Sequence, residues 1–508
     1  MRIAIIAPSA MPARRANTIQ TAKMAQAFAR LGHEVLLIAP SLPSPLRGEG
    51  KGGGEILTSP PPQSSPARGE EGQSSPARGE EEWEGKGGGE ILTSPPPQFS
   101  PARGGEGQPS PLRGEGKGGG EFLTSPPPQS SPVRGEEEWE GKGGGEILTS
   151  PPPQSSPARG EGKGGGEGWQ SFAHHYGLST PFEIAWLTSN PSLKRYDFAL
   201  RAVLNARAWH ADLIYTRLPQ AAALSSLIGM KTIFEMHDLP QGKAKELGRI
   251  FLAGKGACRL VVISQALAGA LIPIYPQLKT SSGHGEGHPF LIVAPDGVDL
   301  ERFSPWLTTA QARQKLKEQG CSLTDQFIAG YTGHLYPGRG IELIQQLALR
   351  FPEVLFLLIG GEDPDLENLQ TSLSRQQIQN IRLGGFIPNA ILPLYQMACD
   401  VLLMPYQEHV AGSSGGDIAN FLSPLKLFEY LASGRPILAS DLQVFREILN
   451  EENSILLPPK DLEAWQSALV RLIEAPQKCL SLGQSARLTA ELYTWEERAR
   501  KLLPFPPS

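Results

Sequence analysis

The chain has 508 residues, a formal net charge of −5 and four scattered cysteines without a Cys-x-x-Cys pair. The net charge gives no electrostatic reason to expect nucleic acid as a partner. The scattered cysteines indicate a reducing cytoplasm and no structural zinc site. No apolar run approaches the roughly 20 residues of a membrane-spanning helix, and the first residues lack the flanks of a signal peptide. We expect a cytoplasmic protein; peripheral contact with the inner face of a membrane stays open.

The beginning of the chain predicts the start of a doubly wound α/β sheet. Residues 2–8 are a short apolar run, as in a buried strand. Residues 18–31 carry apolar side chains at helical spacing, and residues 33–38 form a second apolar run. This strand–helix–strand order is typical of a Rossmann-like domain. Arg14 and Asn17 lie in the first loop, where they are either solvated residues or contacts for an acceptor.

Residues 45–167 differ from the rest of the chain. The motif GKGGGE recurs with its lysine at Lys51, Lys86, Lys117, Lys142 and Lys163. The spacing shrinks from copy to copy, whereas stacked solenoid repeats keep a fixed period. Pro, Gly, Ser, Glu and Arg dominate, so the segment cannot bury enough apolar surface to offset the entropy of ordering. We expect a long, disordered, low-complexity insertion in the first domain.

Ordered sequence is expected to resume near Trp169 and to complete the first domain. Further strands are predicted at residues 182–187, 211–217, 231–240 and 260–264, with a helix at residues 196–209. Ligands of parallel sheets bind at the carboxyl ends of strands, where Arg217 and His237 fall. Lys194, Arg195 and Arg201 form either an ordinary solvated face or a contact for anionic lipid headgroups.

Residues 301–486 repeat the pattern and predict a second Rossmann-like domain. Its strands are expected at residues 326–335, 354–362, 381–388, 399–406 and 434–440. A Gly/Ser-rich loop then leads to a helix that should begin with Ser423 as N-cap and Pro424 at its first position. Gly434 should end this helix in the left-handed conformation.

Lys426 and Glu429 lie three residues apart on one face of that helix. The free N–H groups of the first turn, the helix dipole and Lys426 together suit an anion. Glu429 can accept hydrogen bonds from hydroxyl groups. A ligand that carries an anionic group next to hydroxyl groups is the ribose diphosphate part of a sugar nucleotide. The alternative is an ordinary surface Lys–Glu pair.

The segment from Ser423 to Leu449, SPLKLFEYLASGRPILASDLQVFREIL, resembles the nucleotide-sugar motif of the family 4 glycosyltransferases. That family has two Rossmann-like domains facing a cleft, the B-type fold, and usually carries Glu-x7-Glu here. Glu429 matches the second glutamate, whereas the first falls on Phe421. The resemblance implies a first domain of residues 1–44 and 168–300, a second of 301–486, and a last helix, 487–508, that crosses back to the first domain.

The resemblance also implies roles for single residues. EMHDLP is similar to the family's segment whose histidine, here His237, faces the donor sugar. GHLYPGRG is similar to a loop in which two cations hold the diphosphate; Arg339 matches the second and His334 replaces the first. His237, Arg339 and Lys426 are therefore the expected catalytic residues. The expected donor-binding residues are Glu429, His334, Ser423, Leu425, Asp417, Phe386 and Ile387. Asp417 would in part replace the missing glutamate. Phe386 and Ile387 would flank the base, and the alternative for these two residues is packing in the core. Arg14, Asn17 and Arg217 are expected on the acceptor side.

The function implied is transfer of a sugar from a UDP- or GDP-sugar to a hydroxyl group of a glycan or lipid-linked acceptor, with retention of configuration. No DxD stands at the end of a strand, and Arg339, Lys426 and the helix N-terminus can stabilise the leaving group, so we expect neither a metal nor another cofactor. Two alternatives stay open: a non-catalytic sugar-nucleotide or glycan-binding protein, and a sugar-nucleotide epimerase on the same fold. A dinucleotide oxidoreductase is disfavoured because no GxGxxG follows the first strand.

Overall fold

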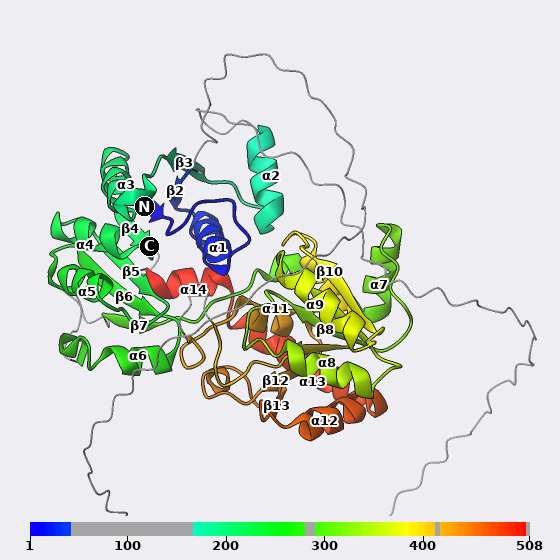
Figure 1. Ribbon diagram of the computed structural model, residues 1–508. Coiled ribbons are helices and arrows are strands. Elements are labelled where there is room, and N and C mark those ends of the chain that lie inside the picture. The colour runs from blue at the N-terminus through cyan, green and yellow to red at the C-terminus, as the bar shows by residue number, and fades with distance from the viewer. Residues whose placement is uncertain (42–165, 280–289, 412–416, 504–508) are drawn as a thin grey trace, which may run out of the picture. The chain divides into compact units, whose positions relative to one another are not determined.

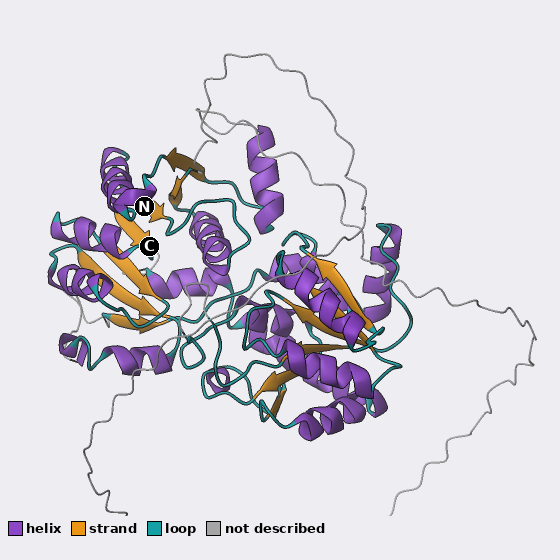
Figure 2. Ribbon diagram, viewed as in Figure 1, coloured by secondary structure: helices purple, strands orange, loops and turns teal. Residues whose placement is uncertain are grey.

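Two parallel β-sheets organise the computed structural model (Figure 1, Figure 2), which describes residues 1–41, 166–279, 290–411 and 417–503. These residues fall within one compact unit of the chain. The insertion expected at residues 45–167 lies outside the described residues, except for its last two, which begin helix α2 (Gly166–Tyr176). Part of the Gly/Ser-rich loop, residues 412–416, also lies outside them.

The first sheet has seven parallel strands in the order β3-β2-β1-β4-β5-β6-β7. The strands are β1 (Arg2–Ile6), β2 (Glu34–Pro40), β3 (Glu183–Leu187), β4 (Leu213–Thr216), β5 (Thr232–Met236), β6 (Ala257–Val262) and β7 (Leu291–Val293). The helices of this half are α1 (Ala16–Arg30), α2, α3 (Tyr196–Ala208), α4 (Pro219–Leu227), α5 (Lys243–Ala253) and α6 (Gln265–Leu271), with short 3-10 turns η1 (Pro191–Leu193) and η2 (Pro276–Lys279).

The second sheet has six parallel strands in the order β10-β9-β8-β11-β12-β13. The strands are β8 (Ile328–Thr332), β9 (Leu355–Ile359), β10 (Ile381–Gly385), β11 (Val401–Met404), β12 (Ile437–Ser440) and β13 (Ile455–Leu457). The helices are α7 (Thr309–Glu318), α8 (Ile341–Arg350), α9 (Asp365–Arg375), α10 (Leu392–Ala398), α11 (Leu425–Ser433), α12 (Leu462–Glu474), α13 (Pro476–Glu491) and α14 (Trp495–Leu502), with 3-10 turns η3 (Leu300–Phe303) and η4 (Phe445–Glu447).

The central strands of both sheets are buried on both faces, as the apolar runs predict. In β1, Ile3 and Ile5 pack in one hydrophobic cluster while Ala4 and Ile6 pack in another, because successive side chains point to opposite faces of a strand. The order of the strands reverses between β1 and β4 in the first sheet and between β8 and β11 in the second. These two points are where doubly wound sheets open a crevice for ligands. The expected α/β class is confirmed.

The last helix belongs to the hydrophobic core of the first sheet. Trp495, Ala499 and Leu502 of α14 lie in the same cluster as Ile3 and Phe28. The buried guanidinium group of Arg498 donates hydrogen bonds to the backbone oxygens of Ala294 (3.1 Å) and Pro295 (2.8 Å). The C-terminal segment therefore packs against residues that lie far from it in the sequence.

The start of α11 differs from the prediction, while its end agrees with it. Leu425 is the first helical residue, and Pro424, with φ −77° and ψ 131°, is the N-cap. The prediction of Ser423 as N-cap is wrong, because the extended backbone of Pro424 moves the hydroxyl group of Ser423 away from the first helical amides. Its Oγ instead accepts a hydrogen bond from the backbone N–H of Asp296 (3.1 Å). Gly434 ends the helix with φ 64°, which confirms the left-handed stop.

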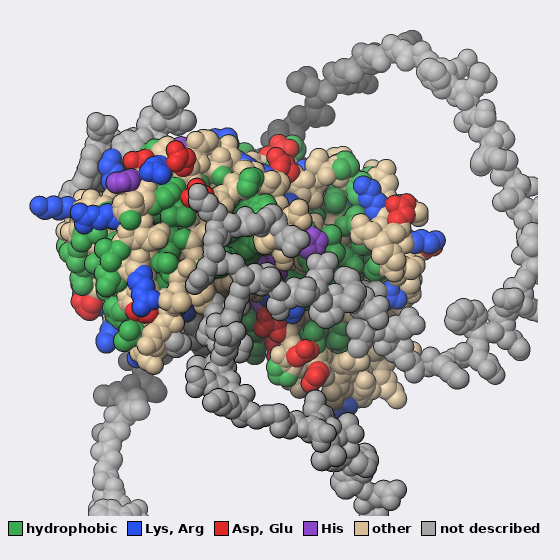
Figure 3. All heavy atoms as spheres, turned by 90° about the horizontal axis from the view of Figure 1, so that it is seen from above, with side chains coloured by type: hydrophobic (Ala, Val, Ile, Leu, Met, Phe, Trp, Pro, Cys, Tyr) green, Lys and Arg blue, Asp and Glu red, His purple; other side chains and the backbone are tan. Residues whose placement is uncertain are grey.

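Within the described ranges, no helix is long and apolar enough to cross a membrane. Large hydrophobic side chains nevertheless reach the surface at several positions. Figure 3 shows hydrophobic side chains (green) gathered beside those of Lys and Arg (blue) on the left of the face in view.

Candidate functional site

Lys426 lies in the first turn of α11 with its ammonium group buried. The residue is 9% exposed, and its Nζ has no hydrogen-bond partner among the residues that the structure describes. Two aromatic rings border it: Nζ lies 3.7 Å from the ring centre of Tyr331 and 5.4 Å from that of Tyr406. Burial, and next the charge of Arg339, lowers the pKa of Lys426 well below its usual value. A buried amine without a partner is unfavourable unless an anion completes it.

Gly333, directly after β8, allows this position of Lys426. Its φ of +133° disfavours any residue with a side chain, and a Cβ there would lie 2.8 Å from Nζ of Lys426. The end of β8 and the first turn of α11 therefore meet at the point where the strand order of the second sheet reverses.

Arg339 approaches the same place from the loop between β8 and α8. Its guanidinium carbon lies 4.8 Å from the ring centre of Tyr406, and one terminal nitrogen contacts the backbone oxygen of Ala411 at 3.5 Å. Its Nε is buried and has no partner within the described ranges. Arg339 and Lys426 thus converge over Tyr406, which is the arrangement that a diphosphate site between them requires.

His334 follows Gly333 and stacks on Tyr336, with ring centres 4.7 Å apart and planes at 3°. The hydroxyl group of Tyr331 donates to the backbone oxygen of His334 at 2.6 Å and holds this turn. Burial lowers the pKa of His334, and Lys426 and Arg339 add to this effect. The ring is therefore neutral at neutral pH and can offer a hydrogen bond but no charge.

Glu429 lies one turn after Lys426 and is held at both carboxylate oxygens. Arg302 of η3 donates to Oε1 at 3.1 Å, and the amide of Gln396 in α10 donates to Oε2 at 3.2 Å. Nε of Arg302 and Oε1 of Gln396 are themselves buried without partners in the described part of the chain. The surroundings of Glu429 therefore retain unused hydrogen-bonding capacity, which suits the hydroxyl groups of a ribose.

The loop after β10 holds the two residues expected beside the base. The side chain of Ile387 is 8% exposed and belongs to the core of the second sheet, so for this side chain core packing is the correct interpretation. Phe386 is half-buried and stacks on His175 of α2, with ring centres 5.6 Å apart. The guanidinium carbon of Arg14 lies 4.0 Å from its ring centre. Arg14 therefore contacts an aromatic ring of the predicted donor side.

Three further expected residues have partners within the protein. Asp417 binds Nδ1 of His409 (2.8 Å) and the amides of Val410 and Ala419, and these hydrogen bonds lower its pKa to about 2. It closes its own loop. Leu425 packs against the hydrophobic cluster around α1. The amide nitrogen of Asn17 donates to Ser9 (2.9 Å), whereas its oxygen is buried without a partner in the described residues.

His237 lies after β5 in a hydrogen-bonded network of the first sheet. Its Nε2 bonds to Glu235, and the amide nitrogen of Gln20 lies 3.0 Å from the same atom. Burial, followed by the charge of Arg217, lowers the pKa of His237 to about 4, so the ring is neutral. Arg217 donates to the amide oxygen of Gln20, so its guanidinium group is partly used within this network.

Glu235, His237 and Asp296 place three metal-ligand atoms within 4.8 Å of one another. The amide nitrogen of Gln20 lies among them and donates to Asp296 at 2.9 Å. Arg498 forms an ion pair with Glu235 at 2.9 Å. A cation would have to replace the amide and would meet the positive charge of Arg498, so these residues fit a hydrogen-bonded network better than a metal.

The sequence reasoning missed Gln20, Glu235, Asp296 and Arg498. They come from four separate segments, and only the fold brings them together. It also missed Tyr331 and Tyr406, because an aromatic residue at a strand end is typical of core packing. The sequence offered one signal, which is position: Tyr406 comes two residues after the end of β11, and His237 comes directly after β5.

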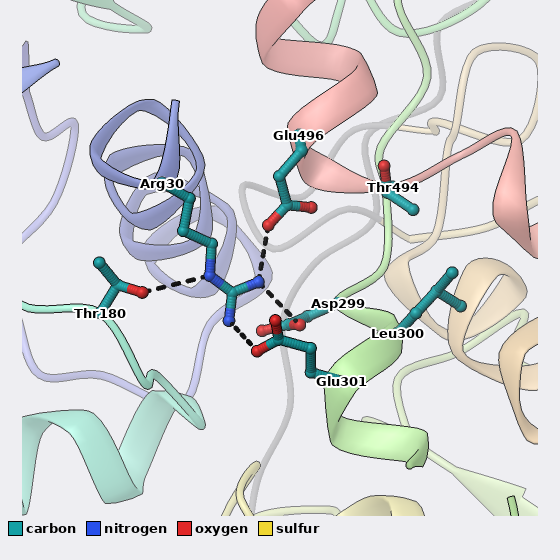
Figure 4. Close-up of a pocket in the computed structure, with 7 residues that line it drawn as sticks. All are labelled: Arg30, Thr180, Asp299, Leu300, Glu301, Thr494 and Glu496. Carbon is teal, nitrogen blue, oxygen red and sulfur yellow. Dashed lines mark hydrogen bonds and ion pairs between the residues drawn. The ribbon is translucent and has the colours of Figure 1, made fainter. Parts of the chain in front are cut away.

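A cavity of about 390 Å³ lies around Arg30 of α1 (Figure 4). Arg30 forms ion pairs with Asp299 (3.2 Å), Glu301 (2.6 Å) and Glu496 (2.6 Å). The positive charge is thus already neutralised by protein carboxylates. This cavity has no residue in common with the Lys426 site and does not suit an anionic donor.

The comparison with known proteins agrees with this site. Residues 327–475 match the family model described as Glycosyl transferases group 1. This part of the chain, which contains Gly333, Arg339, Lys426 and Glu429, is therefore similar to that family, and the match supports the expected resemblance to the family 4 glycosyltransferases.

Individual relatives support the same class. The chain is 28% identical over 229 residues to a D-inositol 3-phosphate glycosyltransferase of Corynebacterium urealyticum, covering 42% of this chain and 50% of the relative. It is 27% identical over 208 residues to a phosphatidyl-myo-inositol mannosyltransferase of Mycolicibacterium smegmatis, covering 40% of this chain and 47% of the relative. The chain thus spans about half the length of these relatives.

Solved structures show the same fold at low identity. A sucrose-phosphate synthase of Thermosynechococcus elongatus superposes with a TM-score of 0.55 at 16% identity, covering 98% of this chain and 96% of that one. A glycosyltransferase of Rickettsia africae superposes with a TM-score of 0.50 at 13% identity, covering 66% of this chain and 86% of that one. These likenesses concern the fold and confirm the expected B-type arrangement of two parallel-sheet domains.

Proposed function

We propose that the chain transfers a glycosyl group from a nucleoside-diphosphate sugar, UDP- or GDP-linked, to a hydroxyl group of a glycan or lipid-linked acceptor. The observation that carries this proposal is the amine of Lys426, buried without a partner and next to Arg339. A diphosphate supplies the negative charge that this place lacks. Glu429, one turn further on, supplies the acceptor for ribose hydroxyl groups.

The leaving diphosphate gains charge as the anomeric C–O bond lengthens. Lys426 and Arg339 stabilise that charge in a dry site, where a preorganised cation has its largest effect. Binding of the diphosphate raises the depressed pKa of Lys426, so the donor brings the amine into its charged form. The neutral His334 adds a hydrogen bond. With these residues in place the departing group needs no metal ion, and we propose catalysis without one.

His237 has a neutral ring at the carboxyl edge of the first sheet, which suits contact with an uncharged sugar. Its hydrogen bond to Glu235 fixes the orientation of the ring. Arg14 and Asn17 keep the acceptor-side role as a proposal, while Arg217 supports the network through Gln20. Relatives named for D-inositol 3-phosphate and phosphatidyl-myo-inositol support an acceptor with hydroxyl groups.

Retention of configuration is part of the same proposal. The likeness to the family 4 enzymes supports it, and so does the choice of residues, since no carboxylate is assigned as a nucleophile. The acceptor hydroxyl then attacks on the face that the diphosphate leaves.

A second candidate is a non-catalytic sugar-nucleotide-binding protein. Phe421 stands where the family has its first glutamate, packs against the core of the first sheet, and its backbone oxygen accepts a hydrogen bond from Ser264 (3.1 Å). In this candidate the donor binds and is not consumed.

The test is release of nucleoside diphosphate from UDP- and GDP-sugars by the full chain, with acceptor extracts and with direct measurement of donor binding. Lys426→Gln and Arg339→Gln should weaken binding and lower release at least about tenfold, as expected for loss of a charge-assisted hydrogen bond. Lys478→Gln, at an exposed lysine of α13, is the matched control. Binding without release for any acceptor supports the non-catalytic candidate. Absence of binding to any nucleoside diphosphate overturns both.

A further inference from the structure

Arg302 lies in the 3-10 turn η3, between the two sheets in the sequence, and its side chain is 8% exposed. The turn is anchored to the second sheet and to α11. Phe303 is fully buried in the core of that sheet, and the indole N–H of Trp306 donates to the backbone oxygen of Ser433 at 2.9 Å. Arg302 therefore projects from a fixed stretch of backbone next to α11.

The guanidinium group of Arg302 connects two parts of the candidate donor site. Its Nη1 donates to Oε1 of Glu429 at 3.1 Å, and its Nη2 donates to the backbone oxygen of Asn389. Asn389 lies in the loop after β10, which also carries Phe386, the residue expected beside the base. A guanidinium group holds two acceptors in a fixed planar fork, whereas an ammonium group is a single point charge. Arg302 thus joins the carboxylate expected at the ribose to the loop expected at the base.

The other buried cation nearby, Lys23 of α1, has different partners. Its ammonium group donates to a backbone oxygen and forms an ion pair with Asp299 at 3.4 Å. Within the described ranges, Arg302 is the one cation that forms an ion pair with Glu429. Without Arg302 this carboxylate would be buried with only the amide of Gln396 as a partner, which is unfavourable for a charge.

The remaining capacity of the Glu429 carboxylate matches a pair of neighbouring hydroxyl groups. A carboxylate accepts about four hydrogen bonds. Arg302 and Gln396 donate one each, to different oxygens. About two positions are left, and the 2′ and 3′ hydroxyl groups of a ribose offer two donors on adjacent carbons. Because both oxygens are held by protein donors, these positions have a fixed direction.

We propose that Arg302 is a positioning residue that makes the donor site selective for a complete nucleotide over a bare diphosphate. This inference rests on the proposed function. Arg302 does not touch the reacting atoms. It acts through Glu429 and the backbone of Asn389, and it keeps the two at a fixed separation so that ribose and base are bound together.

The diphosphate itself should bind independently of Arg302. Lys426 and Arg339 converge over Tyr406, and within the part of the chain that the structure describes neither contacts Arg302. Loss of Arg302 should therefore affect the nucleoside half of the donor and spare the diphosphate half.

The test is equilibrium binding of UDP, GDP, their 2′,3′-dideoxy analogues and pyrophosphate to the full chain. The nucleotide that binds the wild-type protein should bind about tenfold more tightly than its dideoxy analogue, as expected for hydrogen bonds to a charged group. In Arg302→Met this ratio should fall to about one, while the affinity for pyrophosphate should stay within about twofold. The matched control is Arg375→Met, at an exposed arginine of α9, which should change neither quantity.

Two comparisons separate positioning from a merely structural role. In a Glu429→Gln background, Arg302→Met should change the ratio no further, because Arg302 acts on the ribose through Glu429. Arg302→Lys keeps a charge beside Glu429 without the fork, and it should give a ratio between those of the wild type and Arg302→Met. Thermal melting checks the folding of each variant. If Arg302→Met does not fold, Arg302→Lys decides, and a wild-type ratio in that variant overturns the proposal.

Three outcomes with a folded Arg302→Met also overturn it: an unchanged ratio, equal weakening of nucleotide and pyrophosphate binding, or an equal fall of the ratio in Arg375→Met. Failure of the proposed function looks different. The wild-type chain then binds neither UDP nor GDP, which overturns both proposals.

Discussion

Replacing Lys426 by methionine should make the ligand-free protein more stable and prevent nucleoside diphosphates from stabilising it further. Methionine is similar in length and needs no hydrogen bond. An unpaired polar group in a protein interior costs about 1–3 kcal/mol, and the amine, whose pKa burial lowers far below its usual value, gains no cation–π energy from Tyr331 while it is uncharged. The net gain should be about 1 kcal/mol, or about 2 °C in Tm for a chain of this size.

The gain should depend on pH in a defined direction. The pKa of Lys426 is far below its usual value in the folded protein, whereas the unfolded chain keeps the proton up to about pH 10.4. The unfolded state therefore binds more protons between these two values, so the wild-type protein loses stability as pH falls through that window. The Met variant lacks this loss. Its advantage should grow from pH 9.5 downwards, about as far as the depressed pKa, and then stay constant.

Thermal unfolding with and without UDP or GDP checks both halves of this prediction. At a concentration of about 100 Kd the ligand should stabilise the wild-type protein by about 2.7 kcal/mol. Loss of a hydrogen bond to a charged group costs about 1.5–3 kcal/mol, so most of this stabilisation should vanish in the variant. The control is Lys478→Met on the surface of α13. The reasoning is refuted if the ligand-free Met variant melts below the wild type, or if its ligand-induced shift is unchanged.

Three further predictions follow from the same contacts. Gly333→Ala should destabilise the protein by about 1–3 kcal/mol and weaken diphosphate binding, because its Cβ would lie 2.8 Å from the Lys426 amine. The control in urea unfolding and ligand titration is Gly320→Ala, which is also at positive φ (+83°) but in open space. Equal effects of the two substitutions on diphosphate binding would contradict the contact. Glu429→Gln and Arg302→Met should show a coupling of about 2 kcal/mol in a double-mutant cycle by urea unfolding, because each leaves the other charge buried alone; a coupling below about 0.5 kcal/mol would show that the ion pair is not formed. Burial raises the pKa of Asp296 to about 7, so the folded protein binds this proton more tightly than the unfolded chain. The protonated carboxyl group therefore stabilises the folded state at about pH 4, and this stabilisation is lost as pH rises to about 7. Asp296→Asn should remove the resulting decline in Tm, and an unchanged dependence of Tm on pH would show that Asp296 does not titrate there.

The local and repetitive parts of the fold could be predicted from sequence. Buried parallel strands are continuous apolar runs, and the spacing of Lys426 and Glu429 depends only on helix geometry. The convergence of Arg339 with Lys426 was available through the family resemblance. It was not available from spacing, since 86 residues separate the two positions.

The rest depended on tertiary structure. Ser423 is a good N-cap residue, yet its hydroxyl group bonds to Asp296, more than a hundred residues away. Ile387 lies in the loop after β10, yet it packs in the core of the second sheet, and this depends on the elements that surround the loop. The network around His237 needs Gln20 from α1 and Arg498 from α14, and no local pattern connects those positions. Sequence periodicity describes one element at a time, whereas these contacts are made between elements.

The position of α14 has a consequence for dividing the protein into parts. Arg498 supplies the positive charge beside Glu235, which is 1% exposed, and Trp495 and Leu502 complete the hydrophobic layer over α1. A fragment made of the first sheet and its own helices would leave that carboxylate in the interior without a counter-charge and that layer open to water. Dissection of this protein into separately expressed halves therefore has to keep the last helix with the amino-terminal half, fused through a linker or added as a peptide.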